Sequence, residues 1–160
     1  MSHEVVAALI VQSQKILLGL RSATRAFYPD VWDMFGGRVE PGERHEETLV
    51  RELQEELGIT PTQWKYLETL TILLPDPHPS SPKSDKHKSG KYSKPQGRIL
   101  GRGFELIVHL YRVTAWKGTP FNRQPEEHSV IHWFSLAEAE QLHLADPIYP
   151  TLFERYLDHE

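Results

Sequence analysis

The sequence predicts a single domain of the α/β (α+β) class over residues 1–160. Three observations support this prediction. A chain of 160 residues has the usual length of one domain. Hydrophobic residues make up 39% and charged residues 25% of it, which is typical of a globular protein and excludes a disordered or fibrous chain. Apolar runs with strand character are interspersed with segments of helical spacing, as expected for a fold that mixes both elements.

The first half of the chain predicts a hairpin, a loop and a helix. Apolar runs over His3–Val11 and Lys15–Leu20 flank a short polar turn, which is typical of two paired strands. Residues 21–36 are expected to form a loop. A helix is expected over Arg44–Leu57, because Gly58 is suited to the left-handed conformation that ends many helices.

The second half of the chain predicts further strands and two short helices. The strands are expected over Gln63–Leu74, Phe104–Ala115 and Val130–Phe134. Ser135 is a suitable N-cap for a helix over Leu136–Leu142. A last helix is predicted after Pro147 by apolar residues at helical spacing, namely Tyr149, Leu152, Phe153 and Tyr156.

Residues 75–103 form a basic insert in an acidic chain. The insert contains seven basic and two acidic residues, whereas the whole chain has a net charge of −4. A connection of this length is either functional or mobile. We consider three roles for it: closing over a polyphosphate, binding RNA, and acting as a solvated loop. The negative net charge does not favour nucleic acid as a partner.

The sequence also limits the cellular setting. The chain has no cysteine, which excludes disulfides and thiolate metal sites. Its longest apolar run, Val5–Val11, is far shorter than a membrane span, and no basic leader precedes it. We therefore expect a cytoplasmic protein without a membrane partner.

Three glutamates lie on one face of the expected helix. Glu52, Glu55 and Glu56 are related by i, i+3 and i+4 spacing. Each like-charge pair at i, i+4 costs about 0.2–0.5 kcal/mol, and the last turn of a helix prefers cations. A hard divalent cation with oxygen ligands, Mg²⁺ or Mn²⁺, would offset this repulsion. The alternative is a solvated acidic face with Arg51 and Arg44 as its counter-charges.

Nine residues around this helix follow one fixed spacing. The spacing is G-x5-E-x7-R-E-U-x-E-E-x-G-U, where U is aliphatic, and the residues are Gly37, Glu43, Arg51, Glu52, Leu53, Glu55, Glu56, Gly58 and Ile59. This is the complete Nudix box, and the chain resembles the Nudix hydrolases, in particular the small MutT-like members. The resemblance implies an α/β/α sandwich around a mixed β-sheet.

The resemblance also implies an activity and a set of ligands. Nudix hydrolases use water and a divalent metal to cleave a diphosphate linked to another moiety, usually in a nucleotide. The resemblance implies that Glu52 and Glu56 bind the metal directly and that Glu55 binds it directly or through water. The carbonyl of Gly37 is implied as a backbone ligand. Our first choice for the general base is Glu52.

Other residues of the box and its surroundings are assigned by the same resemblance. Arg51 and Glu43 resemble the structural pair that fixes the loop against the helix, so that Arg51 is expected to orient the catalytic glutamates. Gly58 is expected to be structural. MutT-like members often add an acidic residue from a late loop; Glu127 matches best, and Glu126 is the alternative.

The residues before the box are candidates for substrate contacts. Arg21 and Arg25 are expected to meet phosphates, or else to be ordinary surface arginines. Many relatives have Pro-Gly-Gly at the start of the box, but here Phe35 replaces the proline. Phe35 and Trp32 could stack on a base, the alternative being packing in the core. Asp33 could read a base edge or hold a turn.

Within the resemblance we slightly favour a nucleoside triphosphate pyrophosphohydrolase that releases a monophosphate and pyrophosphate. A nucleotide-sugar or dinucleotide pyrophosphatase is the close alternative. A nucleotide- or RNA-binding module that has lost turnover is the alternative from another class, and the intact glutamate trio argues against it. The expected partner is therefore a small nucleotide. The sequence leaves open the oligomeric state, the moiety linked to the diphosphate and the number of metal ions.

Overall fold

The computed structural model describes residues 2–25, 29–74 and 104–157. Its strands are β1 (Ser2–Gln12), β2 (Lys15–Arg21), β3 (Trp32–Asp33), β4 (Phe35–Arg38), β5 (Thr60–Leu74), β6 (Phe104–Lys117) and β7 (His128–Ser135). Its helices are α1 (His45–Leu57), α4 (Leu136–Ala139) and α5 (Tyr149–Tyr156). The basic insert 75–103 lies outside the described residues, and its role stays a prediction.

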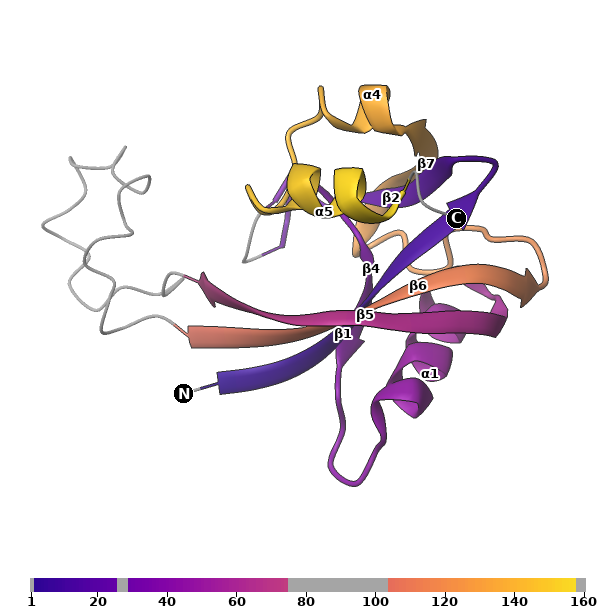
Figure 1. The fold of residues 1–160 in the computed structure, drawn as a ribbon, viewed down its shortest axis with the longest axis vertical. Coiled ribbons are helices and arrows are strands. Elements are labelled where there is room, and N and C mark those ends of the chain that lie inside the picture. The colour runs from indigo at the N-terminus through magenta and orange to yellow at the C-terminus, as the bar shows by residue number, and fades with distance from the viewer. Residues whose placement is uncertain (1, 26–28, 75–103, 158–160) are drawn as a thin grey trace, which may run out of the picture.

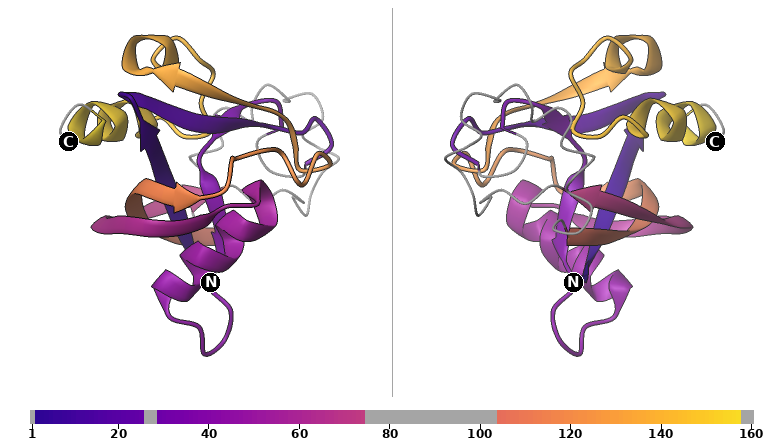
Figure 2. Two further views of the ribbon diagram at one scale, coloured as in Figure 1. Left: turned by 90° about the vertical axis from the view of Figure 1, so that its right-hand side faces the viewer. Right: turned by 90° about the vertical axis from the view of Figure 1, so that its left-hand side faces the viewer.

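Strand β1 connects two groups of strands. It pairs in parallel with β6 over Ser2–Ile10 and antiparallel with β4 over Val5–Ala8, and β6 pairs in turn with β5. At its end, Val11 pairs with Ile16 of β2, and β2 in turn pairs with β3 and β7. The sheet is therefore mixed, and Figure 2 shows β1 running from one group of strands to the other.

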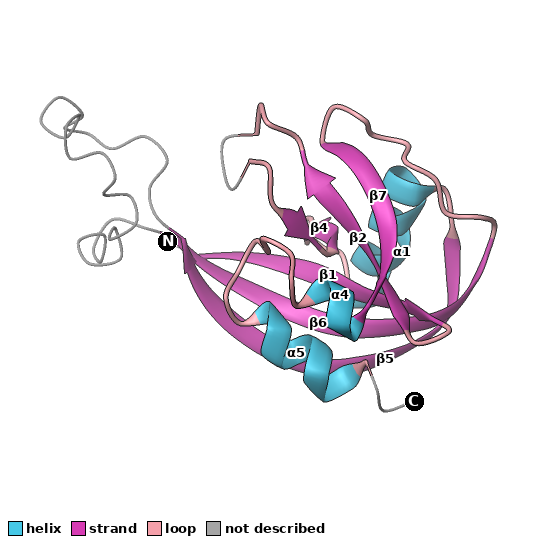
Figure 3. Ribbon diagram, turned by 90° about the horizontal axis from the view of Figure 1, so that it is seen from above, coloured by secondary structure: helices cyan, strands magenta, loops and turns pink. Residues whose placement is uncertain are grey.

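The helices cover opposite faces of the strands, with α1 below and α4 and α5 above in Figure 1. Helix α1 is the covering layer of one core, where Leu49, Leu53 and Leu57 are fully buried. Each such leucine contributes roughly 1.5–3 kcal/mol. Helix α5 covers the other core with Leu152 and Phe153, and Figure 3 shows it lying across the strands. This arrangement is the predicted α+β sandwich.

The alternation of β1 decides which side chains face which helix. Val6, Ala8 and Ile10 belong to the core under α1, whereas Leu9 and Val11 belong to the core under α5. This is the two-residue period of a strand that is buried on both faces. A residue of β1 therefore faces α1 when its number is even and α5 when it is odd.

The predicted hairpin, helices and long strands are confirmed with small shifts in their ends. The turn places Ser13 and Gln14 at positive φ values of 53° and 61°, as a two-residue hairpin turn requires. The helix expected over Leu136–Leu142 ends already at Ala139, and Ser135 caps it by accepting the N–H of Glu138 (3.2 Å).

The loop expected over residues 21–36 was wrong at its end. The structure has two short strands there, and in β4 Gly36 pairs with Ala7 and Gly37 with Val6. A Cβ atom on Gly36 would lie 1.9 Å from the carbonyl oxygen of Val6, and the φ of Gly36 is +150°. Glycine is therefore needed for close pairing with β1, and the glycine pair forms a strand instead of breaking the chain.

Within the described ranges, no helix has both the length and the apolar character needed to cross a membrane.

Candidate active site

Both ends of α1 are fixed by local contacts. The backbone N–H of Arg44, the N-cap residue, donates to Glu47 Oε1 (2.9 Å). At the other end Gly58 has a φ of 70°, and its N–H donates to the carbonyl of Gln54 (3.0 Å). A Cβ atom on Gly58 would lie 2.6 Å from the ring of Phe121, so a side chain would be both strained and crowded there.

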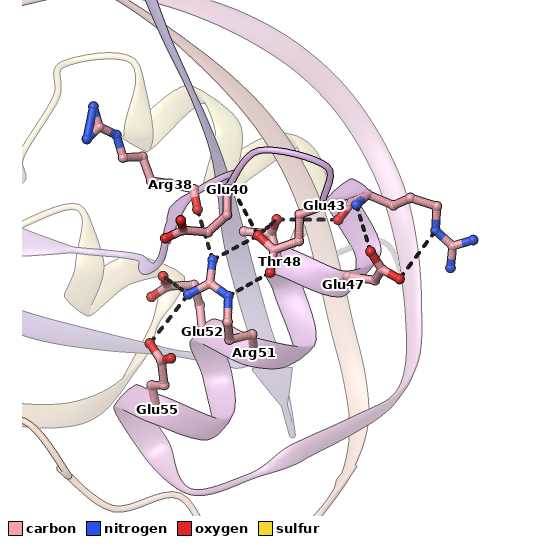
Figure 4. Close-up of polar contacts among 9 residues, drawn as sticks. Arg38, Glu40, Glu43, Glu47, Thr48, Arg51, Glu52 and Glu55 are labelled. Carbon is pink, nitrogen blue, oxygen red and sulfur yellow. Dashed lines mark hydrogen bonds and ion pairs between the residues drawn. The ribbon is translucent and has the colours of Figure 1, made fainter.

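Arg51 joins α1 to the loop that precedes it (Figure 4). Its guanidinium contacts Glu43 through Nε–Oε2 (2.6 Å) and NH2–Oε1 (2.9 Å), and it donates to the carbonyl of Arg38 (3.0 Å). Its NH1 group contacts Glu52 (2.9 Å) and Glu55 (3.5 Å). These bonds to Arg51, followed by the backbone N–H of Glu40, lower the pKa of Glu43 to about 2.

Glu52 and Glu56 reach past the glycine pair of β4. The N–H of Gly36 donates to Glu56 Oε1 (3.1 Å), and a Cβ atom on Gly37 would lie 2.3 Å from the Glu52 carboxyl group. The side chain of Glu56 is buried, which raises its pKa well above the ordinary value, and the charges of Glu52 and Glu127 raise it further. Burial also raises the pKa of Glu52, against the opposing effect of Arg51.

These observations fit a hard divalent cation. Two partly or fully buried carboxylates face one another at Glu52 and Glu56, with the charge of Glu127 close to them, and all three groups offer oxygen ligands. Gly37 leaves the space beside Glu52 that a side chain would fill. The donor set is the one that Mg²⁺ and Mn²⁺ prefer, and a cation would remove the mutual repulsion.

The carboxylates border a cavity of ≈ 740 Å³. Its walls include Val5 and Ala7 of β1 and Leu106 and Val108 of β6. By the alternation of β1, Val5 and Ala7 face away from α1, whereas Val6, which also borders the cavity, belongs to the core under α1. The glutamates of α1 thus reach a cavity that extends to the opposite face of the sheet, past the glycines of β4, which have no side chains.

Two arginines contribute positive charge to the cavity. Arg25 NH1 lies 3.3 Å from the carbonyl oxygen of Glu127 and 3.6 Å from its carboxylate. Arg21 NH1 lies 3.0 Å from Asp33 Oδ2. Both guanidinium groups line the same cavity as the glutamates, so anionic and cationic side chains are brought together there.

Asp33 is the centre of a partly buried polar cluster in the cavity wall. It accepts hydrogen bonds from the Tyr149 hydroxyl (2.5 Å) and the Met34 N–H (2.8 Å), in addition to Arg21. Burial raises the pKa of this carboxyl group, and its donors oppose the rise. The sequence predicted that Asp33 reads a base edge or holds a turn. It predicted Tyr149 only as a residue of the last helix.

His128 is a cavity residue that the sequence analysis did not identify. It is 4% exposed, its ring lies 4.9 Å from that of Phe35, and it lines the cavity. Burial, followed by the charges of Arg25 and Arg21, lowers its pKa to about 4. In the sequence, His128 follows Glu126 and Glu127, and nothing there distinguishes it from a surface histidine.

Most of the predicted site residues line the cavity, and a few lie outside it. The residues that line the cavity are Arg21, Arg25, Asp33, Phe35, Gly37, Glu52, Glu55, Glu56 and Glu127. Glu126 is exposed and does not line it, so the structure brings Glu127 to the glutamates. Arg51 contacts the glutamates without lining the cavity.

The structure shows packing contacts for both Phe35 and Trp32, the stated alternative to stacking on a base, which stays a prediction. The side chain of Phe35 is 1% exposed and belongs to the core under α1, although it also borders the cavity. Trp32 packs edge-on against Phe134, with ring centroids 4.8 Å apart, and is absent from the described lining of the cavity. Both rings pack in the protein interior because β3 and β4 are strands rather than an open loop.

Comparisons with known proteins agree with this site. The family model of the NUDIX domain matches residues 1–156. The chain is 34% identical to the CTP pyrophosphohydrolase of Escherichia coli (strain K12) over 151 residues, which cover 93% of this chain and 87% of that protein. It is 35% identical to the 8-oxo-dGTP diphosphatase of the same organism over 75 residues, 47% of this chain and 58% of that protein.

A solved structure gives the same result. The solution structure of the E. coli ORF135 protein superposes with a TM-score of 0.66 at 31% identity and covers 98% of this chain and 89% of that one. The resemblance and the fold predicted from the box are therefore confirmed. The chain belongs to the NUDIX family and is a hydrolase.

Proposed function

We propose that this protein hydrolyses nucleoside triphosphates to a nucleoside monophosphate and pyrophosphate with the help of Mg²⁺ or Mn²⁺. The observation that carries the proposal is the convergence of Glu52, Glu56 and Glu127 on a cavity that also holds Arg21 and Arg25. The names of two relatives, a CTP pyrophosphohydrolase and an 8-oxo-dGTP diphosphatase, support a triphosphate substrate.

The metal ligands in this proposal are the carboxylates of Glu52, Glu56 and Glu127 and the carbonyl of Gly37. Glu55, whose side chain is 49% exposed, completes the set directly or through water. A bound divalent cation neutralises phosphate charge and lowers the pKa of bound water. Arg51 takes no direct part in the reaction and positions Glu52 by its 2.9 Å contact.

The reaction needs a base and a place for the phosphates. In our proposal Glu52 accepts the proton of the water that attacks phosphorus, the anhydride P–O bond breaks, and the leaving phosphate departs with the electron pair. General-base assistance of this kind is worth about 10²–10⁴-fold in rate. Arg25 and Arg21 hold the phosphate oxygens, and the cluster of Asp33 and Tyr149 meets the nucleoside.

A substrate screen tests this function. The protein is incubated with Mg²⁺ in ¹⁸O-labelled water with nucleoside triphosphates, nucleotide sugars and dinucleoside polyphosphates, and the products are identified by mass. We expect a monophosphate and pyrophosphate, one of them labelled, and no turnover by Glu56→Gln. Cleavage of nucleotide sugars or dinucleotides with triphosphates left intact would overturn the preferred substrate.

Binding is measured in parallel with turnover. Salt-sensitive binding of RNA without hydrolysis of any nucleotide would favour the binding module over the enzyme. A cytoplasmic location is part of the proposal and is tested by fractionating cells that express the protein.

A further inference from the structure

A second group of metal-binding side chains lies near the start of α1. It consists of Glu4 in β1, His45 as the first residue of α1, and His109 in β6. Glu4 Oε1 lies 3.3 Å from His45 Nε2 and 3.1 Å from His109 Nε2. One ligand atom from each side chain lies within 4.8 Å of the other two.

The topology explains why these three residues meet. Strands β1 and β6 are parallel neighbours with Val6 opposite His109, and Glu4 points to the same face as Val6. That face is the one covered by α1, and the first residue of the helix comes down beside the two strands. Glu52 follows His45 by seven positions, which corresponds to about 10 Å along the helix. The cluster is therefore distinct from the glutamates of the candidate active site.

The surroundings prepare His109 to act as a ligand. Its Nδ1 atom lies 3.0 Å from Thr69 Oγ1, and when Nδ1–H donates to that oxygen, the lone pair of Nε2 is directed at Glu4. A hydrogen bond of this kind, made by the other ring nitrogen, accompanies almost every histidine that binds a metal. The rings of His109 and His45 are stacked at 3.8 Å, so both Nε2 atoms approach the same carboxylate.

The cluster also has an open side. The side chain of His109 is 12% exposed, that of His45 is 35% exposed and that of Glu4 is 50% exposed. Three protein ligands with one side open to water leave room for a fourth, exchangeable ligand.

We propose that Glu4, His45 and His109 form a zinc site that ties the start of α1 to β1 and β6. Two imidazole nitrogens and one carboxylate oxygen are a ligand set that Zn²⁺ takes, with water in the fourth position. Imidazole selects zinc and similar transition metals over Mg²⁺, so the two metals separate between this cluster and the glutamates of α1. The site binds zinc whether or not the protein turns over nucleotides.

Equilibrium dialysis against Zn²⁺ with excess Mg²⁺, followed by metal analysis of the protein, tests the proposal. We expect one zinc per chain in the wild type and the loss of this equivalent in His109→Ala, His45→Ala and Glu4→Gln. The exposed His143 serves as the matched control, and His143→Ala should keep the zinc. Thr69→Val should weaken zinc binding by about 10–100-fold, because His109 loses its partner.

A second measurement uses only the wild-type protein, so that it does not depend on the folding of the variants. Ring-nitrogen NMR signals of His45 and His109 in the wild-type protein should shift on addition of one equivalent of Zn²⁺, and those of His143 should not. A wild type that binds no zinc would mean that Glu4 is only a hydrogen-bonded carboxylate between two imidazoles. Full zinc binding by His109→Ala and His45→Ala would equally overturn the proposal.

Discussion

Arg51 and Glu43 form a two-point ion pair across the loop–helix junction, with Nε–Oε2 at 2.6 Å and NH2–Oε1 at 2.9 Å. The same guanidinium reaches Glu52 through NH1 (2.9 Å). A planar fork that binds a carboxylate at two points holds both its own position and that of its other partners. The loop before α1 and the orientation of Glu52 are therefore controlled by one side chain.

The first prediction tests this control. Glu43→Gln removes the charge that holds the guanidinium, and Arg51 can then turn toward Glu52 and Glu55. We expect turnover of the substrate to fall by about 10–100-fold, as is usual when a partner of a metal ligand is lost. Steady-state kinetics over a range of Mg²⁺ concentrations measure the effect. Glu47→Gln in the first turn of α1 is the control, and equal activity of the two variants would refute the prediction.

The second prediction distinguishes two neighbouring glutamates. Glu127 lines the cavity and contacts Arg25, whereas Glu126 is exposed outside it. We expect Glu127→Gln to raise the Mg²⁺ concentration needed for half-maximal activity and Glu126→Gln to leave it unchanged. The opposite result in the two variants would assign the metal-binding role to Glu126.

The third prediction concerns the buried hydroxyl of Tyr149. Tyr149→Phe removes the hydrogen bond to Asp33, whose side chain is only 17% exposed. The expected cost is about 1–3 kcal/mol of unfolding free energy, measured by urea denaturation. Tyr156→Phe is a matched control, because its hydroxyl donates at 2.5 Å to the more exposed Glu68. A smaller loss is expected there, and equal losses would contradict the argument from burial.

The fourth prediction follows from the pKa of His128, which burial lowers from 6.5 to about 4. Below pH 6.5 the unfolded chain takes up a proton that the folded protein excludes, so stability falls as the pH drops toward 4. Between pH 7 and pH 5 this residue should contribute a loss of about 2 kcal/mol. Urea denaturation at the two pH values should show a smaller loss in His128→Gln than in the wild type. An equal loss in both proteins would refute this assignment, and exposed His143→Gln should match the wild type.

The sequence predicted the elements whose signals are local. The helix with its glutamate face, the ending at Gly58 and the cap at Ser135 depend on residues within a turn or two of one another. The glutamates of the box were found for the same reason, since their spacing alone places them on one face.

Features that depend on distant partners were missed. Strand β4 exists because Gly36 and Gly37 pair with β1, and nothing near these glycines indicates that partner. This pairing in turn buries the Phe35 ring, which the sequence offered as a stacking surface. The position of His128 in the cavity likewise follows from the pairing of β7 with β2, across a hundred residues of chain.

The central claim is that Glu52 and Glu56 are held together so that a divalent cation can bind between them. The most direct test measures the Mn²⁺ affinity of the Glu56→Gln variant by titration calorimetry and compares it with the affinity of Glu47→Gln. We predict at least a tenfold loss of Mn²⁺ affinity, no turnover, and metal-free thermal stability that is unchanged or higher, because one buried charge is removed. Wild-type Mn²⁺ affinity together with wild-type turnover in Glu56→Gln would contradict the account.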